Sequence, residues 1–157
     1  MEIERKYLMA RLPENLETYS YIDIEQGYIS TAPVIRIRKK CTVDSERYVL
    51  TIKSSGMLSR QEYELELTGE EYEGLKPKVE GNIISKRRYI IPLREEDLTL
   101  ELDIFKGAFE GLIMGEIEFP DKKRAEAYVP EDMLGSEVTF DRRFHNSNMS
   151  SMSMEDI

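Results

Sequence analysis

Charged residues of one sign recur two positions apart at several points along this chain of 157 residues. In a β-strand, residues i and i+2 point to the same face, so each such pair presents two like charges side by side. Carboxylate oxygens are the ligands that hard divalent cations prefer, whereas phosphate is matched by Arg and Lys. The acidic pairs are Glu2/Glu4, Glu62/Glu64, Glu101/Asp103 and Glu116/Glu118, and the basic residues are Lys6, Arg36, Arg38, Lys53, Lys86 and Arg88. Together they have the chemistry of a site for a metal–polyphosphate complex.

The elements that carry these residues are expected to be short strands. Alternation with a period of two, rich in β-branched, aromatic and aliphatic residues, predicts strands. Turn signals separate the strands, and short, evenly spaced antiparallel strands favour a barrel or a sandwich. The predicted strands are 2–10, 21–30, 33–41, 46–53, 60–68, 83–92, 98–106 and 112–119.

Helices are expected to be few. The segment Thr68-Gly69-Glu70-Glu71 is a capping box that predicts a helix ending before Pro77. A second helix is expected between Pro120 and Pro130, and a third element follows Asp141.

Two interpretations of the like-charged pairs are open. For any single pair, such as Glu62/Glu64, a sheet with one face in water explains the alternation. Across the whole set, however, like charges on neighbouring strands destabilise a sheet unless something compensates them. We therefore expect the charged face to line the lumen of a closed sheet, whereas ordinary small barrels fill their interior with apolar side chains. The apolar outer face must then be covered by helices or by a second copy of the chain, in a homodimer.

Composition narrows the function classes. A formal net charge of −9 argues against general nucleic-acid binding. No apolar run approaches the length of about 20 residues that a membrane span needs, and the charged N-terminus has no signal-peptide core. One cysteine, Cys41, fits a reducing compartment. We expect a single cytoplasmic domain over residues 1–157, with the Ser/Met-rich segment 146–157 as a mobile tail.

The charged segments, taken in order, resemble a known family. Glu2-Ile3-Glu4-Arg5-Lys6 is similar to the N-terminal E-x-E-x-K signature of the CYTH superfamily, the triphosphate tunnel metalloenzymes. The resemblance covers nearly the whole chain and is closest to the short bacterial inorganic triphosphatases. Further segments in the family's order are Gln26-Gly27-Tyr28, Ile35-Arg36-Ile37-Arg38, Leu50-Thr51-Ile52-Lys53-Ser54, Ser59-Arg60-Gln61-Glu62-Tyr63-Glu64, Ser85-Lys86-Arg87-Arg88-Tyr89, Leu100-Glu101-Leu102-Asp103 and Glu116-Ile117-Glu118-Phe119.

The resemblance implies a mainly β fold: an eight-stranded antiparallel closed barrel with a charged lumen, few helices outside and a C-terminal plug helix. It implies that the six basic residues bind the triphosphate and that Mg²⁺ or Mn²⁺ is the cofactor. Tyr28 either projects into the tunnel or packs within the barrel. Metal and attacking water are assigned to Glu2, Glu4, Asp103, Glu116 and Glu118, catalysis to Glu2, Glu4 and Lys6, and further site roles to Glu62, Glu64 and Glu101.

Three functions fit these residues, and hydrolysis of inorganic triphosphate to pyrophosphate and phosphate is favoured. An organic triphosphate enzyme on the same fold is the first alternative: a nucleoside or thiamine triphosphatase, or an adenylyl cyclase. The absence of Trp and the short chain weigh against a pocket for a base or thiamine. The second alternative is a non-catalytic polyphosphate-binding module. The acidic pairs argue against it, because anion binding alone would suffer from them.

Overall fold

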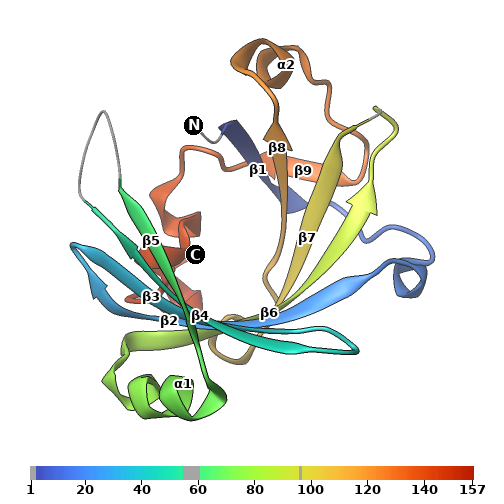
Figure 1. The fold of residues 1–157 in the computed structure, drawn as a ribbon. Coiled ribbons are helices and arrows are strands. Elements are labelled where there is room, and N and C mark those ends of the chain that lie inside the picture. Colours follow the sequence, from blue (N-terminus) through green and yellow to red (C-terminus); the bar gives the residue numbers. More distant parts are fainter. Residues whose placement is uncertain (1–2, 55–60, 96) are drawn as a thin grey trace.

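The computed structural model describes residues 3–54, 61–95 and 97–157, and its main feature is one antiparallel sheet (Figure 1). The sheet has nine strands in the order β5-β4-β3-β2-β6-β7-β8-β1-β9. Figure 1 shows it strongly curved, so that the ends of the order rise on either side of a concave face. The strands are β1 (Ile3–Met9), β2 (Tyr21–Thr31), β3 (Val34–Cys41), β4 (Glu46–Lys53), β5 (Glu62–Leu67), β6 (Glu80–Pro92), β7 (Thr99–Lys106), β8 (Ile113–Phe119) and β9 (Leu134–Glu137).

The mainly antiparallel architecture is confirmed, but two details differ from the sequence-based expectation. The sheet has nine strands instead of eight, and among the described residues β5 and β9 are not paired with each other to close it. The extra strand, β9, escaped prediction because its four residues include Gly135 and show no apolar alternation. It is held by pairing with β1, where Tyr7 lies opposite Glu137 and Met9 opposite Leu134.

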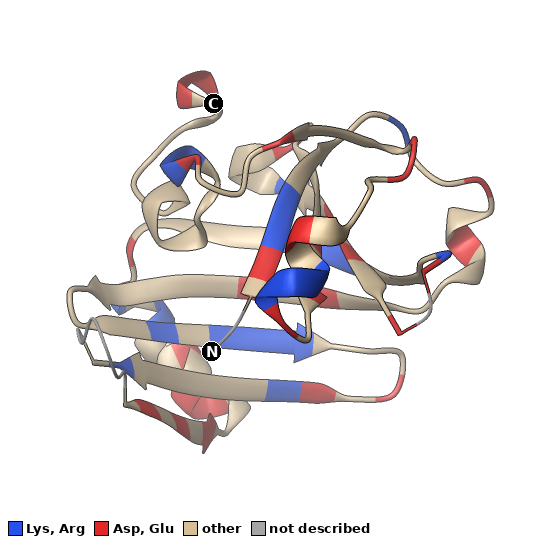
Figure 2. Cartoon of the chain, turned by 90° about the horizontal axis from the view of Figure 1, so that it is seen from above, with Lys and Arg blue, Asp and Glu red and all other residues tan. Residues whose placement is uncertain are grey.

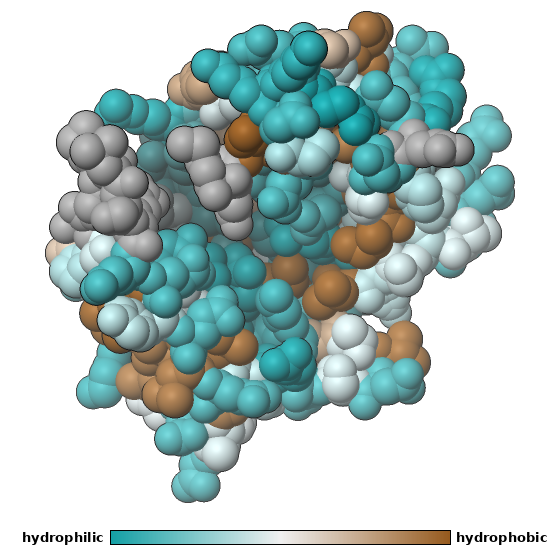
Figure 3. Space-filling view, turned by 45° about the horizontal axis from the view of Figure 1, so that its top comes forward, coloured by the Kyte–Doolittle hydropathy of each residue, from teal (hydrophilic) through white to brown (hydrophobic). Residues whose placement is uncertain are grey.

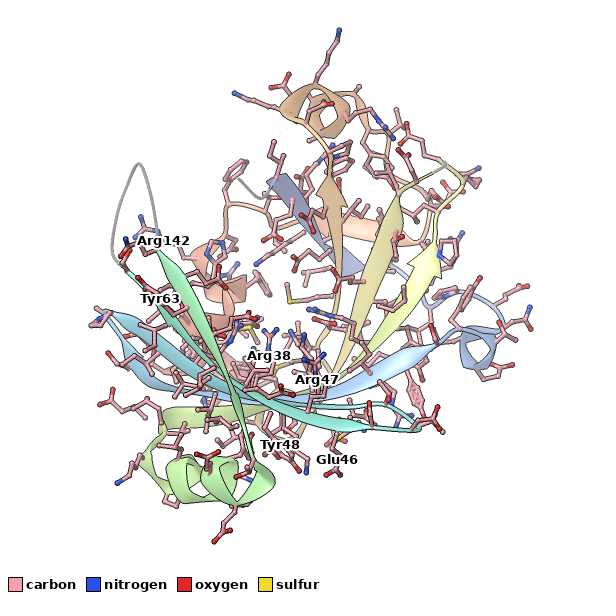
Figure 4. All side chains as sticks on the ribbon, in the orientation of Figure 1. Arg38, Glu46, Arg47, Tyr48, Tyr63 and Arg142 are labelled. Carbon is pink, nitrogen blue, oxygen red and sulfur yellow. The ribbon has the colours of Figure 1, made fainter. Side chains whose placement is uncertain are left out.

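The strand register separates the two faces of the sheet. Cross-strand partners share a face, and Arg38 lies opposite Gln26, Arg88 opposite Asp103, and Lys6 opposite Glu116. These side chains belong to the concave face, where Figure 4 shows Arg38 pointing away from helix α1. The convex face includes the fully buried apolar residues Ile37, Leu102 and Ile117, together with ion pairs such as Arg87–Asp23.

Helices cover parts of the convex face. Helix α1 (Gly69–Leu75) begins with the predicted capping box, in which Glu71 N donates to Thr68 Oγ1 at 3.1 Å and Thr68 N to Glu71 Oε1 at 2.8 Å. Its buried Tyr72 packs with Ile37 and Leu67. Helix α2 (Lys122–Ala127) places Ala125 in the core over β7, β8 and β1. No helix in the described part of the chain is long and apolar enough to cross a membrane.

The C-terminal segment lies on the concave side of the sheet (Figure 1). Its 3-10 helix Arg142–Phe144 and helix α3 (Asn146–Met149) contribute Phe144 and Met149 to a core with Ile84, Phe105 and Met114. Met149 is fully buried, so residues 146–157, expected from sequence to be mobile, include a packed anchor. The remaining 3-10 helices are Leu16–Thr18, Lys76–Lys78, Gly107–Phe109 and Met154–Asp156.

Candidate functional site

The first part of the site is a pair of arginines on β3. Arg38 Nε donates to Gln26 Oε1 at 2.7 Å, and Arg36 Nη2 lies 3.4 Å from Thr51 Oγ1. Within the described ranges of the chain, neither guanidinium has a carboxylate within 4.0 Å. Burial, together with the charges of Arg36 and Arg88, lowers the pKa of Arg38 to about 10. Among the described residues the two arginines thus hold positive charge that no carboxylate contacts directly, which suits the binding of an anion.

The second basic pair, Lys86 and Arg88 on β6, is compensated by acids on β7. Lys86 Nζ lies 2.8 Å from Asp103 Oδ2. Arg88 donates two hydrogen bonds to the same carboxylate, from Nε to Oδ1 at 2.8 Å and from Nη2 to Oδ2 at 3.0 Å. Arg88 Nη1 also reaches Glu101 Oε2 at 2.7 Å. These contacts fix both basic side chains in one orientation on the concave face.

Asp103 is a buried acid held by two basic side chains. Burial raises the pKa of its carboxyl, but the charge of Lys86 and the hydrogen bonds from Arg88 outweigh burial, so the pKa is lowered overall. Oδ1 accepts from Arg88, and Oδ2 accepts from both Arg88 and Lys86. The geometry therefore supports a role in orienting Lys86 and Arg88, and the metal-ligand role expected from sequence stays a prediction.

Carboxyl groups on β1 and β8 form the acidic part of the site. Glu4 lies opposite Glu118 on the neighbouring strand, and Lys6 lies opposite Glu116. Burial raises the pKa of Glu116, but a hydrogen bond with Glu4 and the charge of Lys6 lower it further than burial raises it. Lys6 Nζ lies 3.9 Å from Glu4 Oε1. Two carboxyl groups so close together form a place that a divalent cation could occupy.

These acids fit Mg²⁺ or Mn²⁺ through the chemistry of their donors. Mg²⁺ is usually held by one or two carboxylates, with waters and substrate phosphates completing its shell, and Glu4 and Glu116 supply two. No three Asp, Glu, His or Cys side chains among the described residues form a ready-made metal cluster. Glu2, the other acid expected here, lies outside the described residues.

The concave face is a recess whose exposed lining is hydrophilic (Figure 3). At one end, a pocket of about 450 Å³ is lined by Glu101, Glu118, Asp97 and Thr99, with Ile90, Phe119 and Pro120. Near the other end, Phe144 and Asn146 of the C-terminal segment border a cavity of about 10 Å³ that Lys6, Lys86, Asp103 and Glu116 also line. The C-terminal segment therefore lies directly against the charged residues, while the acidic end is roomier.

Two of the acids predicted for the site, Glu62 and Glu64, lie apart from the carboxyl groups on β1 and β8. Glu62 and Glu64 are exposed on β5 at the edge of the sheet, and Figure 2 shows the acidic stripes of this strand beside the grey trace. Lys53 lies opposite Glu62 on the adjacent strand. These three residues border the concave face near one end of the strand order. Tyr28, by contrast, lies opposite Arg36 and is only 4% exposed, so it both faces the arginines and packs in the sheet.

Sequence reasoning assigned no role to Gln26 and Thr51, the partners of the two arginines. Both are buried polar residues, 0% and 1% exposed. Gln26 precedes Tyr28 by two residues and Thr51 precedes Lys53 by two. The same period of two that grouped the charged residues would have found them, had neutral polar residues been included.

Comparisons with known proteins agree with this geometry. No family model matches the chain. An inorganic triphosphatase from Nitrosomonas europaea is 38% identical over 149 residues, covering 95% of this chain and 96% of that protein. Another from Acetivibrio thermocellus is 35% identical over 156 residues, covering 94% and 92%.

A solved structure agrees as well. The crystal structure of an inorganic triphosphatase superposes with a TM-score of 0.78 and 33% identity, over 97% of this chain and 95% of that one. A protein from Hippeastrum, described as a putative adenylyl cyclase with a dominant triphosphatase activity, shares the fold at a TM-score of 0.52 and 19% identity, over 80% of this chain and 83% of that one. The chain belongs to the inorganic triphosphatase family of the CYTH superfamily.

Proposed function

We propose that this protein hydrolyses inorganic triphosphate to pyrophosphate and phosphate on the concave face of its sheet, with Mg²⁺ or Mn²⁺. One observation carries the proposal: Arg36 and Arg38, which no carboxylate of the described residues contacts, lie on the same face as the carboxyl pair Glu4/Glu116. The names of the relatives support the choice of substrate.

The basic residues bind and align the phosphates. Arg36 and Arg38, which no carboxylate of the described residues contacts, bind the negative phosphates, and Lys86 and Arg88 are held in place by Asp103. Phosphoryl transfer depends mostly on positioning and on neutralising charge, so an extended row of bases suits a linear triphosphate. Lys6 and Lys53 extend this row, and Tyr28 limits its width beside Arg36.

The acidic residues hold the cation and the attacking water. Glu4 and Glu116 would hold the cation, with Glu118 and Glu2 nearby in the strand or the sequence. A bound cation would supply positive charge to neutralise phosphate oxygens during in-line attack. Glu2 or Glu4 orients a water molecule and accepts its proton as the new P–O bond forms. The bond between the terminal phosphorus and the bridging oxygen breaks, and pyrophosphate leaves.

We also propose that the curved sheet, within one domain over residues 1–157, encloses the family's tunnel and that the C-terminal segment closes one mouth of it. The support is the packing of Phe144 and Met149 against concave-face residues. Substrate then enters at the roomier end near Glu101 and Glu118. The homodimer stays a prediction. We expect its interface at the exposed apolar residues on the convex side of β4 and β5, which are Ile52, Tyr63 and Leu65.

A substrate panel tests the proposed function. Phosphate release is measured from tripolyphosphate, ATP, thiamine triphosphate and pyrophosphate, each with Mg²⁺, with Mn²⁺ and with excess chelator. We expect release from tripolyphosphate far faster than from the others, and none in chelator. Rapid release from ATP without release from tripolyphosphate would overturn the choice of substrate, and full activity in chelator would overturn the role of the metal.

A further inference from the structure

Gln26 is a buried neutral residue among the basic residues Arg36, Arg38, Lys86 and Arg88, which we call the basic cluster. It lies on β2, between Arg38 of β3 and Ile84 of β6, and none of its surface is exposed. Its Oε1 accepts a hydrogen bond from Arg38 Nε at 2.7 Å. Its Nε2 has no hydrogen-bond partner among the described residues, and the same is true of the buried Nε of Arg36.

Unpartnered buried donors are uncommon because each loses its hydrogen bonds to water without replacement. Gln26 Nε2 and Arg36 Nε belong to residues on adjacent strands, and both residues face the concave side through the pairings Gln26–Arg38 and Tyr28–Arg36. A phosphate oxygen accepts several hydrogen bonds at once and would satisfy donors of this kind.

The amide of Gln26, which holds Arg38, is neutral, whereas the neighbouring bases Lys86 and Arg88 are held by a negatively charged carboxylate. Lys86 and Arg88 are oriented by Asp103, whose negative charge cancels part of theirs. Arg38 is oriented by a neutral oxygen, so its hydrogen bond fixes the guanidinium without reducing its charge. One half of the basic cluster is thus pre-oriented and still fully cationic, as binding of a highly charged anion requires.

We propose that Gln26 is a positioning and phosphate-binding residue of the triphosphate site. Its Oε1 fixes Arg38, and its Nε2, together with Arg36 Nε, donates to a phosphate oxygen of the substrate. The inference rests on the proposed function and adds to it a neutral residue whose lack of charge is the essential property.

The variant Gln26→Glu separates this role from a structural one. Glu has the same size and keeps an acceptor for Arg38, so a purely structural role survives the change. It removes the donor and adds a negative charge beside the phosphates. We expect an unchanged or higher Tm, a KM for tripolyphosphate raised about tenfold or more, and a smaller change in kcat. Metal-free calorimetry with tripolyphosphate should show the same loss of affinity.

Two further variants complete the experiment. Gln26→Met keeps the volume but removes both hydrogen-bonding groups, and it too should raise KM. Asn15→Asp adds the same single charge at an exposed loop position and should leave KM unchanged. Equal KM values for wild type and Gln26→Glu, or for wild type and Gln26→Met, would overturn the inference. A wild-type protein that neither binds nor hydrolyses tripolyphosphate would instead overturn the proposed function.

Discussion

Replacing Asp103 by Asn should destabilise the protein strongly and weaken substrate binding. The side chains of Lys86, Asp103 and Arg88 are 2%, 8% and 16% exposed, so the change leaves two basic groups buried without their shared carboxylate. Removing one partner of a buried ion pair costs about 3–5 kcal/mol. For a domain of this size each kcal/mol shifts Tm by about 2–4 °C, so we expect a fall of about 6–20 °C.

The assay is thermal unfolding at pH 7, together with kinetics on tripolyphosphate. We expect KM to rise because Lys86 and Arg88 lose their common anchor. Asp97→Asn is the matched control, since Asp97 pairs with Arg124 at 3.1 Å on the surface and should change Tm little. A Tm within about 2 °C of wild type, with an unchanged KM, would refute the reasoning that Asp103 orients the two bases.

Three further predictions follow from the same contacts. The pKa of Asp103 is lower in the folded protein than its unfolded value of about 3.9. The carboxylate therefore stabilises the fold above about pH 4, and this stabilisation is lost as the pH falls through the lower, folded pKa. The difference in Tm between wild type and Asp103→Asn should accordingly narrow below about pH 4. Glu4→Gln should lower kcat by about 100-fold or more while the affinity for tripolyphosphate in metal-free calorimetry changes little, and equal losses in both would argue against a role confined to the cation and the attacking water. Phe144→Ala should cost about 3–5 kcal/mol in denaturant unfolding, because Phe144 is 3% exposed in the core that anchors the C-terminal segment; a loss below about 1 kcal/mol would show that the segment is not anchored there.

Features set by local spacing could be predicted from the sequence. Alternation placed Arg36 with Arg38 and Lys86 with Arg88, because the direction of a side chain in a strand depends only on its position in that strand. The capping box at Thr68 and Glu71 was predictable for the same reason, since its two hydrogen bonds join residues three positions apart.

Features that depend on which strands are neighbours could not be predicted. Asp103 is bound by Lys86 and Arg88 because β6 lies beside β7 in a register that sets Arg88 opposite Asp103. Glu62 and Glu64 are exposed because β5 is the last strand in the order. The burial of Met149 depends on distant residues of the concave face, among them Ile84 and Phe105. Each of these features depends on how distant parts of the chain are arranged, which the spacing of residues does not encode.

The central claim is that Arg36 and Arg38 of β3 bind the triphosphate, and calorimetric titration with tripolyphosphate tests it most directly. The proteins to compare are wild type, the double variant Arg36→Gln/Arg38→Gln, and Arg87→Gln, a neighbouring arginine on the convex face that pairs with Asp23. Charged hydrogen bonds contribute about 1.5–3 kcal/mol each, so the double variant should bind about 100-fold more weakly or worse, while Arg87→Gln binds like wild type. An unchanged Kd in a folded double variant would contradict the account.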